Sequence, residues 1–141
     1  MKNILITGGA GFIGSHLCHV LHDQNFNLTV LDNLSPQIHG QNAEPPTWLS
    51  KLGVNFIKGS VTSRQALEKA MEGTDAIIHL AAETGTGQSM YEIEKYNEVN
   101  TQATAIMLDI IANQKCPNLQ RILLASSRSV YGEGAYACTN C

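Results

Sequence analysis

The sequence has few charged residues, few aromatic residues and no long apolar run. Its charge and its apolar runs each exclude a class of protein. Charged residues make up 15% and aromatic residues 6% of the 141 residues, and the formal net charge is −3. Because lysine and arginine form no basic block, we expect no nucleic-acid partner. No apolar run approaches a membrane span, and the consecutive apolar residues 4–6 are too few for a signal-peptide core. We therefore expect a cytoplasmic protein with no membrane partner.

Cysteine is also scarce, and its spacing is too uneven for a disulfide scaffold. Cys138 and Cys141 form a single CxxC pair, and one such pair cannot close a tetrahedral zinc site. His16, His19 and His22 recur at intervals of three, but no acidic or cysteine ligand completes a set. We predict no metal site. The four cysteines are Cys18, Cys116, Cys138 and Cys141.

A short strand, a glycine turn and a helix at the N-terminus predict a dinucleotide-binding unit. Residues 2–7 form an apolar run typical of a buried parallel strand, and Gly-Gly-Ala-Gly-Phe-Ile-Gly follows at 8–14. The turn fits G-x-G-x-x-G and, with Thr7, T-G-x-x-G-x-x-G. We expect one glycine to turn the chain at positive φ, Gly11 to admit a pyrophosphate, and Gly14 to let the helix pack close to its strand. The N–H groups at the helix N-terminus would then face the phosphates.

Strands and helices alternate along the rest of the chain, which predicts an α/β fold with a Rossmann-like, doubly wound parallel sheet. The expected strand order is 3-2-1-4-5 with right-handed crossovers. The length suits one domain, so residues 1–141 are interpreted as an NAD(P)-binding Rossmann domain. The expected strands cover residues 2–7, 28–32, 54–58, 75–82 and 121–125. The expected helices cover residues 12–23, 48–52, the segment between Thr62 and Gly73, and 89–113.

Three local patterns give further structural predictions. The polar, proline-containing stretch 35–47 is interpreted as a loop. Thr62 and Gln65 have the spacing of a capping box at the start of a helix. Helix 12–23 should bury one apolar stripe. That stripe consists of Ile13, Leu17, Val20 and Leu21.

Asp32 ends the second expected strand, 18 residues after Gly14. A carboxylate at this place can accept hydrogen bonds from both ribose hydroxyls of an adenosine and repels a 2′-phosphate. Asn33 follows it, where an arginine would favour NADP. We therefore predict NAD as the cofactor. The alternative role for Asp32 is to cap a turn at the end of its strand.

The motifs together resemble the extended short-chain dehydrogenase/reductase family of nucleotide-sugar epimerases and dehydratases. Within that family, the loops 81–89 and 126–136 are most similar to those of dTDP-L-rhamnose 4-epimerases and less similar to those of UDP-glucose 4-epimerases. The resemblance extends along the whole chain. Its motifs are Thr7 to Gly14, Asp32-Asn33-Leu34, His79-Leu80-Ala81-Ala82, Val99-Asn100 with Ala103-Thr104, and Ser126 to Gly132.

The resemblance implies NAD as cofactor and a nucleotide sugar as the substrate of the full-length enzyme. It implies that Phe12 and Ile13 offer backbone N–H groups to the pyrophosphate and that Asp32 holds the ribose. Ser127 matches the catalytic serine or threonine that binds the sugar C4 oxygen; its alternative role is to cap the end of its strand. The full set of expected cofactor-binding residues is Gly8, Gly11, Phe12, Ile13, Gly14, Asp32, Asn33, Ser60, Val61, Leu80, Ala81, Ala82 and Asn100.

Two departures from the family pattern affect function. Ser60 replaces the usual aspartate that accepts from the adenine amino group, so adenine would be held more weakly or through the Val61 backbone. The catalytic Tyr-x-x-x-Lys should follow Ser127 by twenty residues or more, and the sequence ends before it. We expect a chain truncated before the substrate domain and inactive alone. Tyr91 and Lys95 have the same spacing, but they precede the serine and are interpreted as an exposed helical turn.

Three functions therefore remain open. The favoured one is the NAD-binding portion of a nucleotide-sugar 4-epimerase, with helix 89–113 as one interface helix of a homodimer. A second is another enzyme of the family, such as a dehydratase or decarboxylase. A dehydratase usually has Asp-Glu after the serine or threonine, whereas Arg128-Ser129 follows here. The third is a non-catalytic NAD-binding module, which the missing tyrosine permits.

Overall fold

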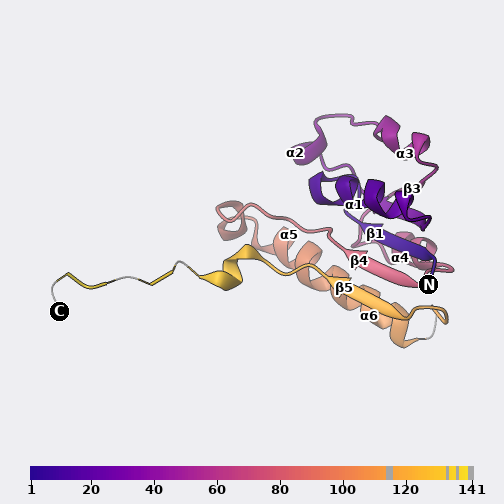
Figure 1. Cartoon of the computed structure of the whole chain (residues 1–141). Helices are drawn as coiled ribbons and strands as arrows, with labels where there is room; N and C mark the ends of the chain where they lie inside the picture. The colour runs from indigo at the N-terminus through magenta and orange to yellow at the C-terminus, as the bar shows by residue number, and fades with distance from the viewer. Residues whose placement is uncertain (114–115, 133, 136, 140–141) are drawn as a thin grey trace.

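The computed structural model describes residues 1–113, 116–132, 134–135 and 137–139, and its centre is a five-stranded parallel sheet (Figure 1). The strand order is β3-β2-β1-β4-β5, and all four neighbouring pairs are parallel, as predicted. The strands are β1 (Asn3–Thr7), β2 (Asn27–Asp32), β3 (Asn55–Lys58), β4 (Ala76–His79) and β5 (Arg121–Leu124). The α-helices are α1 (Phe12–Asp23), α2 (Pro36–His39), α3 (Thr47–Lys51), α4 (Arg64–Met71), α5 (Ile93–Asn97) and α6 (Ala103–Ala112).

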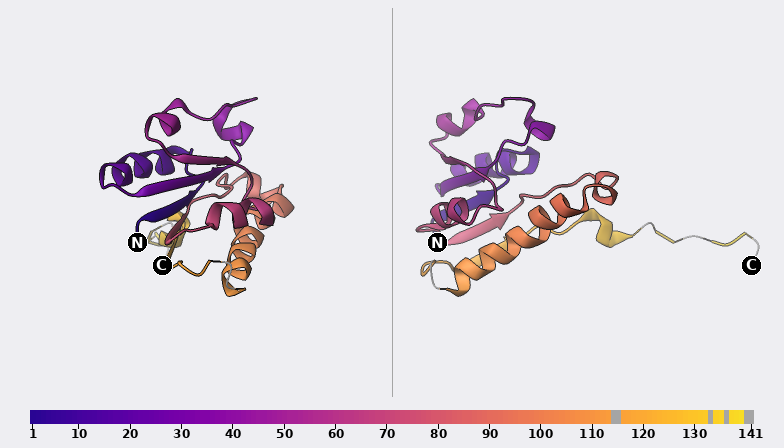
Figure 2. Two further views of the ribbon diagram at one scale, coloured as in Figure 1. Left: turned by 90° about the vertical axis from the view of Figure 1, so that its right-hand side faces the viewer. Right: turned by 180° about the vertical axis from the view of Figure 1, so that it is seen from behind.

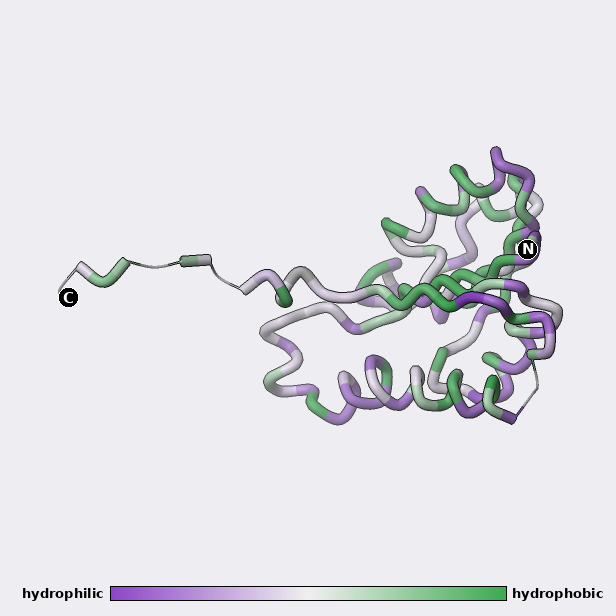
Figure 3. The backbone as a smooth tube through the Cα atoms, turned by 60° about the horizontal axis from the view of Figure 1, so that its bottom comes forward, coloured by the Kyte–Doolittle hydropathy of each residue, from purple (hydrophilic) through white to green (hydrophobic). Residues whose placement is uncertain are grey.

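Helices cover both faces of the sheet, which makes the fold doubly wound (Figure 2). On one face, Leu67 of α4 and Met107 of α6 pack over Leu5 and Ile77 of the central strands. On the other face, α1 and α3 pack over the alternate side chains of the same strands. Figure 3 shows the resulting pattern, in which hydrophobic strands run through the middle of the molecule. No helix in the described part of the chain has the length and apolarity to cross a membrane.

The buried face of α1 differs from the predicted stripe. Ile13 is 62% exposed and Val20 is 53% exposed, whereas Gly14 and Cys18 are the buried residues of this helix. The reason is close packing: a Cβ on Gly14 would lie only 2.5 Å from the Cα of Gly9. Because α1 approaches the glycine turn so closely, small residues lie beneath it, while Leu17 and Leu21 of the predicted stripe are half-buried and Leu21 packs against the core. The close approach predicted for Gly14 is thus present.

The stretch after β2 and the start of α4 also differ from expectation. Residues 35–47 are not all loop, because α2 (Pro36–His39) forms immediately after Ser35. A proline at the first helical position is favourable, since its fixed φ suits a helix and its missing N–H would have no helical partner. The predicted capping box at Thr62 is wrong, because the helix begins one residue later than it requires. Ser63 is the N-cap of α4, and its Oγ accepts from the Ala66 N–H at 3.3 Å.

Strand β4 and the long helix after it are shorter and more divided than predicted. β4 ends at His79, so residues 80–82 lie beyond the sheet. The expected helix 89–113 begins as a 3₁₀ turn, η1 (Gln88–Met90), and continues as α5, a π-helical segment η2 (Glu98–Gln102) and α6. Tyr96, Ala103, Met107 and Ile110 are the buried apolar residues of this stretch. π-helical segments within α-helices often occur at functional sites.

The β5 strand leaves apolar side chains in contact with solvent. Leu123 is 54% exposed and Leu124 is 57% exposed, although both lie beside buried β4. After β5 the chain forms a 3₁₀ turn, η3 (Arg128–Tyr131), which leads away from the sheet (Figure 1). The β5 edge is therefore the part of the sheet that the described residues cover least.

Candidate cofactor site

A groove of about 950 Å³ lies where the strands end, at the edge of the sheet that binds ligands in open α/β folds. Every residue predicted to bind the cofactor lines this groove, and so does Ser127. These residues come from the glycine turn and α1 (Gly8, Gly11, Phe12, Ile13, Gly14), from the ends of β2 (Asp32, Asn33), β3 (Ser60, Val61), β4 (Leu80, Ala81, Ala82) and β5 (Ser127), and from η2 (Asn100).

The N-terminus of α1 opens directly into the groove. Gly11 is its N-cap and provides no side-chain hydrogen bond, and the first turn contains no acidic residue. The N–H groups at such a terminus lack partners within the helix and carry the positive end of its dipole, so an anion is favoured there. A Cβ on Gly11 would meet only the carbonyl oxygen of Gly8, at 3.3 Å. The protein itself leaves this space nearly free, which fits a pyrophosphate resting against the backbone.

Gly8 joins the carboxyl ends of three strands. Its φ is +66°, the positive value predicted for one glycine of the turn, and its N–H donates to the carbonyl of Leu31 at 2.8 Å. A Cβ at this position would lie 2.8 Å from the backbone nitrogen of Ala81. The ends of β1 and β4 can therefore approach each other only because residue 8 is a glycine.

A buried polar contact fixes the same junction. Thr7 Oγ1 lies 2.7 Å from His79 Nδ1 and accepts from the Ala81 N–H at 3.3 Å. Thr7 is fully buried and His79 is 4% exposed. Burial lowers the pKa of His79 from its usual 6.5, because a charged imidazole is poorly solvated there. Thr7 and His79 belong to two separate sequence motifs, and the hydrogen bond between them was not predicted.

Asp32 lies at the end of β2 with its carboxylate held by two backbone groups. Oδ2 accepts from Ala10 N–H at 3.0 Å and Oδ1 accepts from Leu34 N–H at 2.9 Å. His39 of α2 lies nearby, with Nε2 3.8 Å from Oδ1. Each carboxylate oxygen has a second lone pair for a ribose hydroxyl. The turn-capping role that was considered as an alternative is therefore present, and it leaves the carboxylate in the groove.

The side chains of Asn33 and Ser60 are engaged in local turns. Asn33 Oδ1 accepts from Ser35 N–H at 3.0 Å. Ser60 Oγ accepts from Thr62 N–H at 3.1 Å and lies 2.8 Å from Thr62 Oγ1. Val61 beside it is buried. Both polar residues thus shape the groove wall through hydrogen bonds within their own loops.

The loop after β4 is held by the helical segment that follows it. Asn100 Nδ2 donates to the carbonyl of Glu83 at 2.9 Å, and Asn100 Oδ1 accepts from the Glu83 N–H at 2.8 Å. Lys95 Nζ lies 3.3 Å from the Glu83 carboxylate. Asn100 therefore fixes the backbone of the groove wall and uses its amide to do so. Groove residues that the sequence analysis missed include Gln37, His39, Thr86, Ser89 and Tyr96.

Ser127 lines the groove and also caps η3, with its Oγ accepting from Ser129 N–H at 3.1 Å. Its capping alternative is therefore present as well. Ser126 lines the groove too, so position alone does not distinguish the two serines. The loop 126–136 and the CxxC pair both include residues outside the described part, namely Glu133, Tyr136, Asn140 and Cys141.

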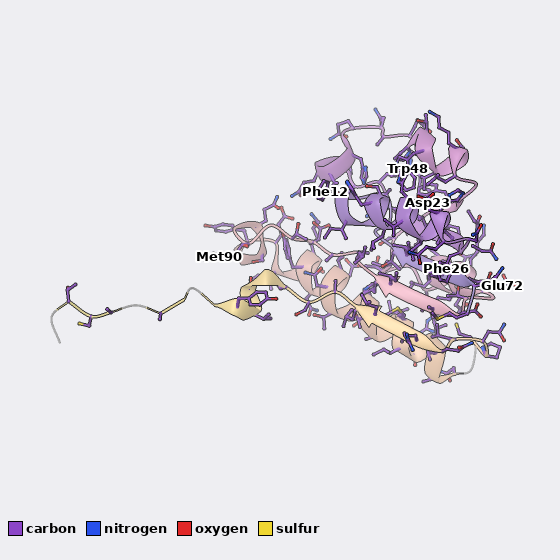
Figure 4. All side chains as sticks on the ribbon, in the orientation of Figure 1. Phe12, Asp23, Phe26, Trp48, Glu72 and Met90 are labelled. Atoms are coloured by element: carbon purple, nitrogen blue, oxygen red, sulfur yellow. The ribbon has the colours of Figure 1, made fainter. Side chains whose placement is uncertain are left out.

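Tyr91 and Lys95 lie where the loop after β4 leads into α5. Tyr91 is 84% exposed and precedes α5, near Met90, which Figure 4 labels at the tip of this loop. Lys95 Nζ bonds to Glu92 Oε2 at 3.1 Å, and this bond, assisted by Glu83, raises the pKa of Lys95. A lysine that lowers the pKa of a tyrosine would have to face it. Their interpretation as an exposed turn fits these contacts.

Two other features lie apart from the groove. A smaller hollow of about 440 Å³ lies at the β3 edge, between residues 55–58 and Lys69 and Glu72 of the α4 end. It contains none of the predicted site residues. Among the described residues, no three or more histidine, cysteine or acidic side chains are grouped as a metal site would require. His16 and His19 instead donate to the carbonyls of Phe12 and Ser15, one helical turn earlier.

Comparison with known families supports the interpretation of the groove. The NAD dependent epimerase/dehydratase family matches residues 4–139. The dTDP-L-rhamnose 4-epimerase of Burkholderia thailandensis is 41% identical over 96% of the chain, and the UDP-glucose 4-epimerase of Yersinia enterocolitica is 34% identical over 93%. The chain spans only 37% and 38% of the lengths of these two relatives. It therefore corresponds to less than two fifths of each curated protein.

Solved structures that are similar to the chain include two UDP-glucose 4-epimerases with bound NAD. A UDP-glucose 4-epimerase from Stenotrophomonas maltophila with bound NAD and formylated UDP-arabinopyranose has a TM-score of 0.78 and 27% identity, over 96% of this chain and 40% of that chain. A UDP-glucose 4-epimerase from Brucella ovis in complex with NAD has a TM-score of 0.76 and 30% identity, over 96% and 39%. NAD, the predicted cofactor, is thus confirmed as the cofactor of the family.

The buried His79 predicts a loss of stability on mild acidification. Its folded-state pKa is below 6.5, so as the pH falls below 6.5 the unfolded chain takes up a proton first. We expect the free energy of unfolding, measured by urea denaturation, to decrease between about pH 7.5 and 5.5. His79→Asn, whose amide can replace Nδ1 beside Thr7, should reduce this dependence.

His22→Asn is the matched control, because His22 has a 44% exposed side chain and should leave the dependence unchanged. Asp75, whose pKa is lowered by hydrogen bonds from the Asn3 and Lys2 N–H groups, affects stability only as the pH falls below about 3.8, outside this range. An equal pH dependence in His79→Asn and the unsubstituted chain would contradict the prediction.

Proposed function

Because the chain belongs to the NAD dependent epimerase/dehydratase family, we propose that residues 1–141 form the NAD-binding portion of a nucleotide-sugar 4-epimerase. One observation carries the proposal: the glycine turn, Asp32 and the loop after β4 all line one groove. The substrate would be a dTDP- or UDP-hexose, as the names of the relatives suggest.

In this proposal the two halves of the groove hold the two halves of the cofactor. The N-terminus of α1 binds the pyrophosphate through the Phe12 and Ile13 backbone, and Asp32 accepts from the adenosine ribose. Ser60 and Val61 flank the adenine, and Leu80 to Ala82 support the middle of the dinucleotide. Ser60 Oγ already bonds to Thr62, so we propose that adenine is held mainly by packing and by the Val61 backbone.

Bound NAD supplies the hydride acceptor and donor for transient oxidation at the sugar C4 position. The residues of this chain would bind it, orient it and place Ser127 beside the sugar oxygen. Residues 128–141 contain no Tyr-x-x-x-Lys, so in this proposal the proton-transferring tyrosine is not supplied by these residues. We therefore propose that the 141-residue chain binds cofactor without converting UDP-glucose or dTDP-L-rhamnose, and conversion by the purified chain would contradict this.

Other functions of the same family are less well supported. The dTDP-D-glucose 4,6-dehydratase of Dictyostelium discoideum is 36% identical over 95% of the chain. Arg128 and Ser129 nevertheless occupy the positions where a dehydratase has its acid pair. A non-catalytic NAD-binding module would use the same groove.

We also propose that the surface of α5 to α6 takes part in a homodimer, since Ile93 and Leu108 are 67% and 50% exposed there.

Asp32 should make the chain select NAD over NADP. A 2′-phosphate would lie against a carboxylate that is 8% exposed, and like charges in such contact are costly. Isothermal titration should show NAD binding at least about tenfold more tightly than NADP. Asp32→Asn should reduce the difference in affinity between NAD and NADP, while the exposed control Asp23→Asn should leave that difference unchanged. Equal or tighter binding of NADP would place Asp32 away from the ribose.

Ser127 should act on the rate and not on cofactor binding. In a chain that continues through the Tyr-x-x-x-Lys pair, its hydroxyl would donate to the C4 oxygen as negative charge develops. Ser127→Ala should lower kcat by about 10²–10³-fold, with little change in NAD affinity. Ser126→Ala, which also lines the groove, is the control and should have a much smaller effect. The reverse result would place the motif one residue out of register.

A further inference from the structure

Two segments that lie on opposite sides of the groove are joined by a reciprocal amide pair. Gln37 of α2 donates through Nε2 to Gln88 Oε1 at 2.7 Å, and Gln88 Nε2 donates to Gln37 Oε1 at 3.3 Å. The two residues are 51 positions apart. We propose that this pair is a clasp that must open for a dinucleotide to enter or leave the groove. The inference rests on the proposed binding of NAD and adds a control over its exchange.

One side of the clasp is the short helix α2. Gln37 and His39 both line the groove, and His39 lies 3.8 Å from the carboxylate of Asp32. The helix is only four residues long and has no buried residue. Its own packing against the sheet is therefore slight. The hydrogen bond from Gln37 to Gln88 on the other wall would hold α2 over the part of the groove near Asp32, where the ribose is proposed to bind.

The other side of the clasp is firmly built. The hydroxyl of Tyr96, a residue that is 9% exposed, donates to the carbonyl of Gly85 at 2.8 Å and contacts Gln88 Oε1 at 3.3 Å. A Cβ on Gly85 would lie 2.4 Å from Gln88 Oε1 and 2.8 Å from the Tyr96 hydroxyl. A side chain at residue 85 would displace the ends of these two side chains. Gln88 Oε1 is thus held in place to receive Gln37.

The position of the clasp explains how it would affect the binding and release of the dinucleotide. Gln37 and His39 border the groove near Asp32, whereas Gly85, Thr86 and Ser89 border it beyond β4. A dinucleotide reaching from Asp32 to Ala82 would pass between these two walls. Because the bonded glutamines join the two walls across this path, the clasp must open before a dinucleotide enters. We propose that it closes again over bound NAD and must open before release.

Gln37 is exposed, Gln88 is half-buried and both are uncharged, so the clasp is weak and its effect is kinetic. A neutral hydrogen bond of this kind shifts an opening equilibrium by about two- to tenfold. Removing it increases the open fraction both with and without cofactor. Association and dissociation should then accelerate by similar factors, and the dissociation constant should change little. Loss of a direct contact to NAD would instead accelerate dissociation alone.

Stopped-flow fluorescence with NADH and the 141-residue chain tests the clasp. Gln37→Ala and Gln88→Ala should each raise both the association and the dissociation rate constants by about two- to tenfold. The double variant should match either single variant, because the pair shares one interaction. Gln41→Ala is the matched control, an exposed glutamine two residues beyond α2, and should leave both rates unchanged.

The outcomes separate the clasp from the proposed function. Tight NADH binding with unchanged rates in Gln37→Ala would refute the clasp alone. Faster dissociation with unchanged association, and a weaker affinity to match, would also refute it and would assign Gln37 a direct contact with the cofactor. Additive effects in the double variant would show that the two glutamines act separately. Failure of the unsubstituted chain to bind NADH would refute the proposed function, and the clasp with it.

Discussion

The close approach of the β1 and β4 ends is the constraint on which the groove depends. Gly8 has no side chain at the point where one would collide with Ala81, and Thr7 links His79 and Ala81 just beside it. The sheet order changes direction at these strands, since the chain leaves β1 toward β2 and later returns to β4. Such a switch point opens a crevice between the diverging loops. The groove is therefore a consequence of the topology, and the glycine turn allows it to be narrow.

The walls of this groove are fixed by hydrogen bonds between side chains and the backbone. Asn100 holds Glu83, Tyr96 holds Gly85, and Asp32 holds the glycine turn through Ala10. Each of these side chains uses part of its hydrogen-bonding capacity on the backbone. A preorganised wall costs less conformational entropy when a ligand binds. The short helix α2 is the exception, because its link to the far wall is the hydrogen-bonded pair of Gln37 and Gln88.

The features predicted from the sequence were those that local patterns encode. Alternating strands and helices were enough for the strand order, and Gly8 to Gly14 with Asp32 located the groove. The exposure of Ile13 and Val20 was not predictable from periodicity, because it depends on how closely α1 approaches the sheet. Helix α2 is too short to show a period. The contacts between Thr7 and His79 and between Gln37 and Gln88 join residues 72 and 51 positions apart, which no local pattern reports.

The most direct measurement is a ¹H–¹⁵N NMR titration of the 141-residue chain with NAD. The account predicts that amide shifts concentrate at the α1 N-terminus, at residues 32–33 and at residues 80–86, in a single saturable process. Residues 55–58 and Lys69, which line the smaller hollow at the β3 edge, should not shift. Shifts confined to that hollow, or none at Phe12 and Ile13 at saturating NAD, would contradict the account.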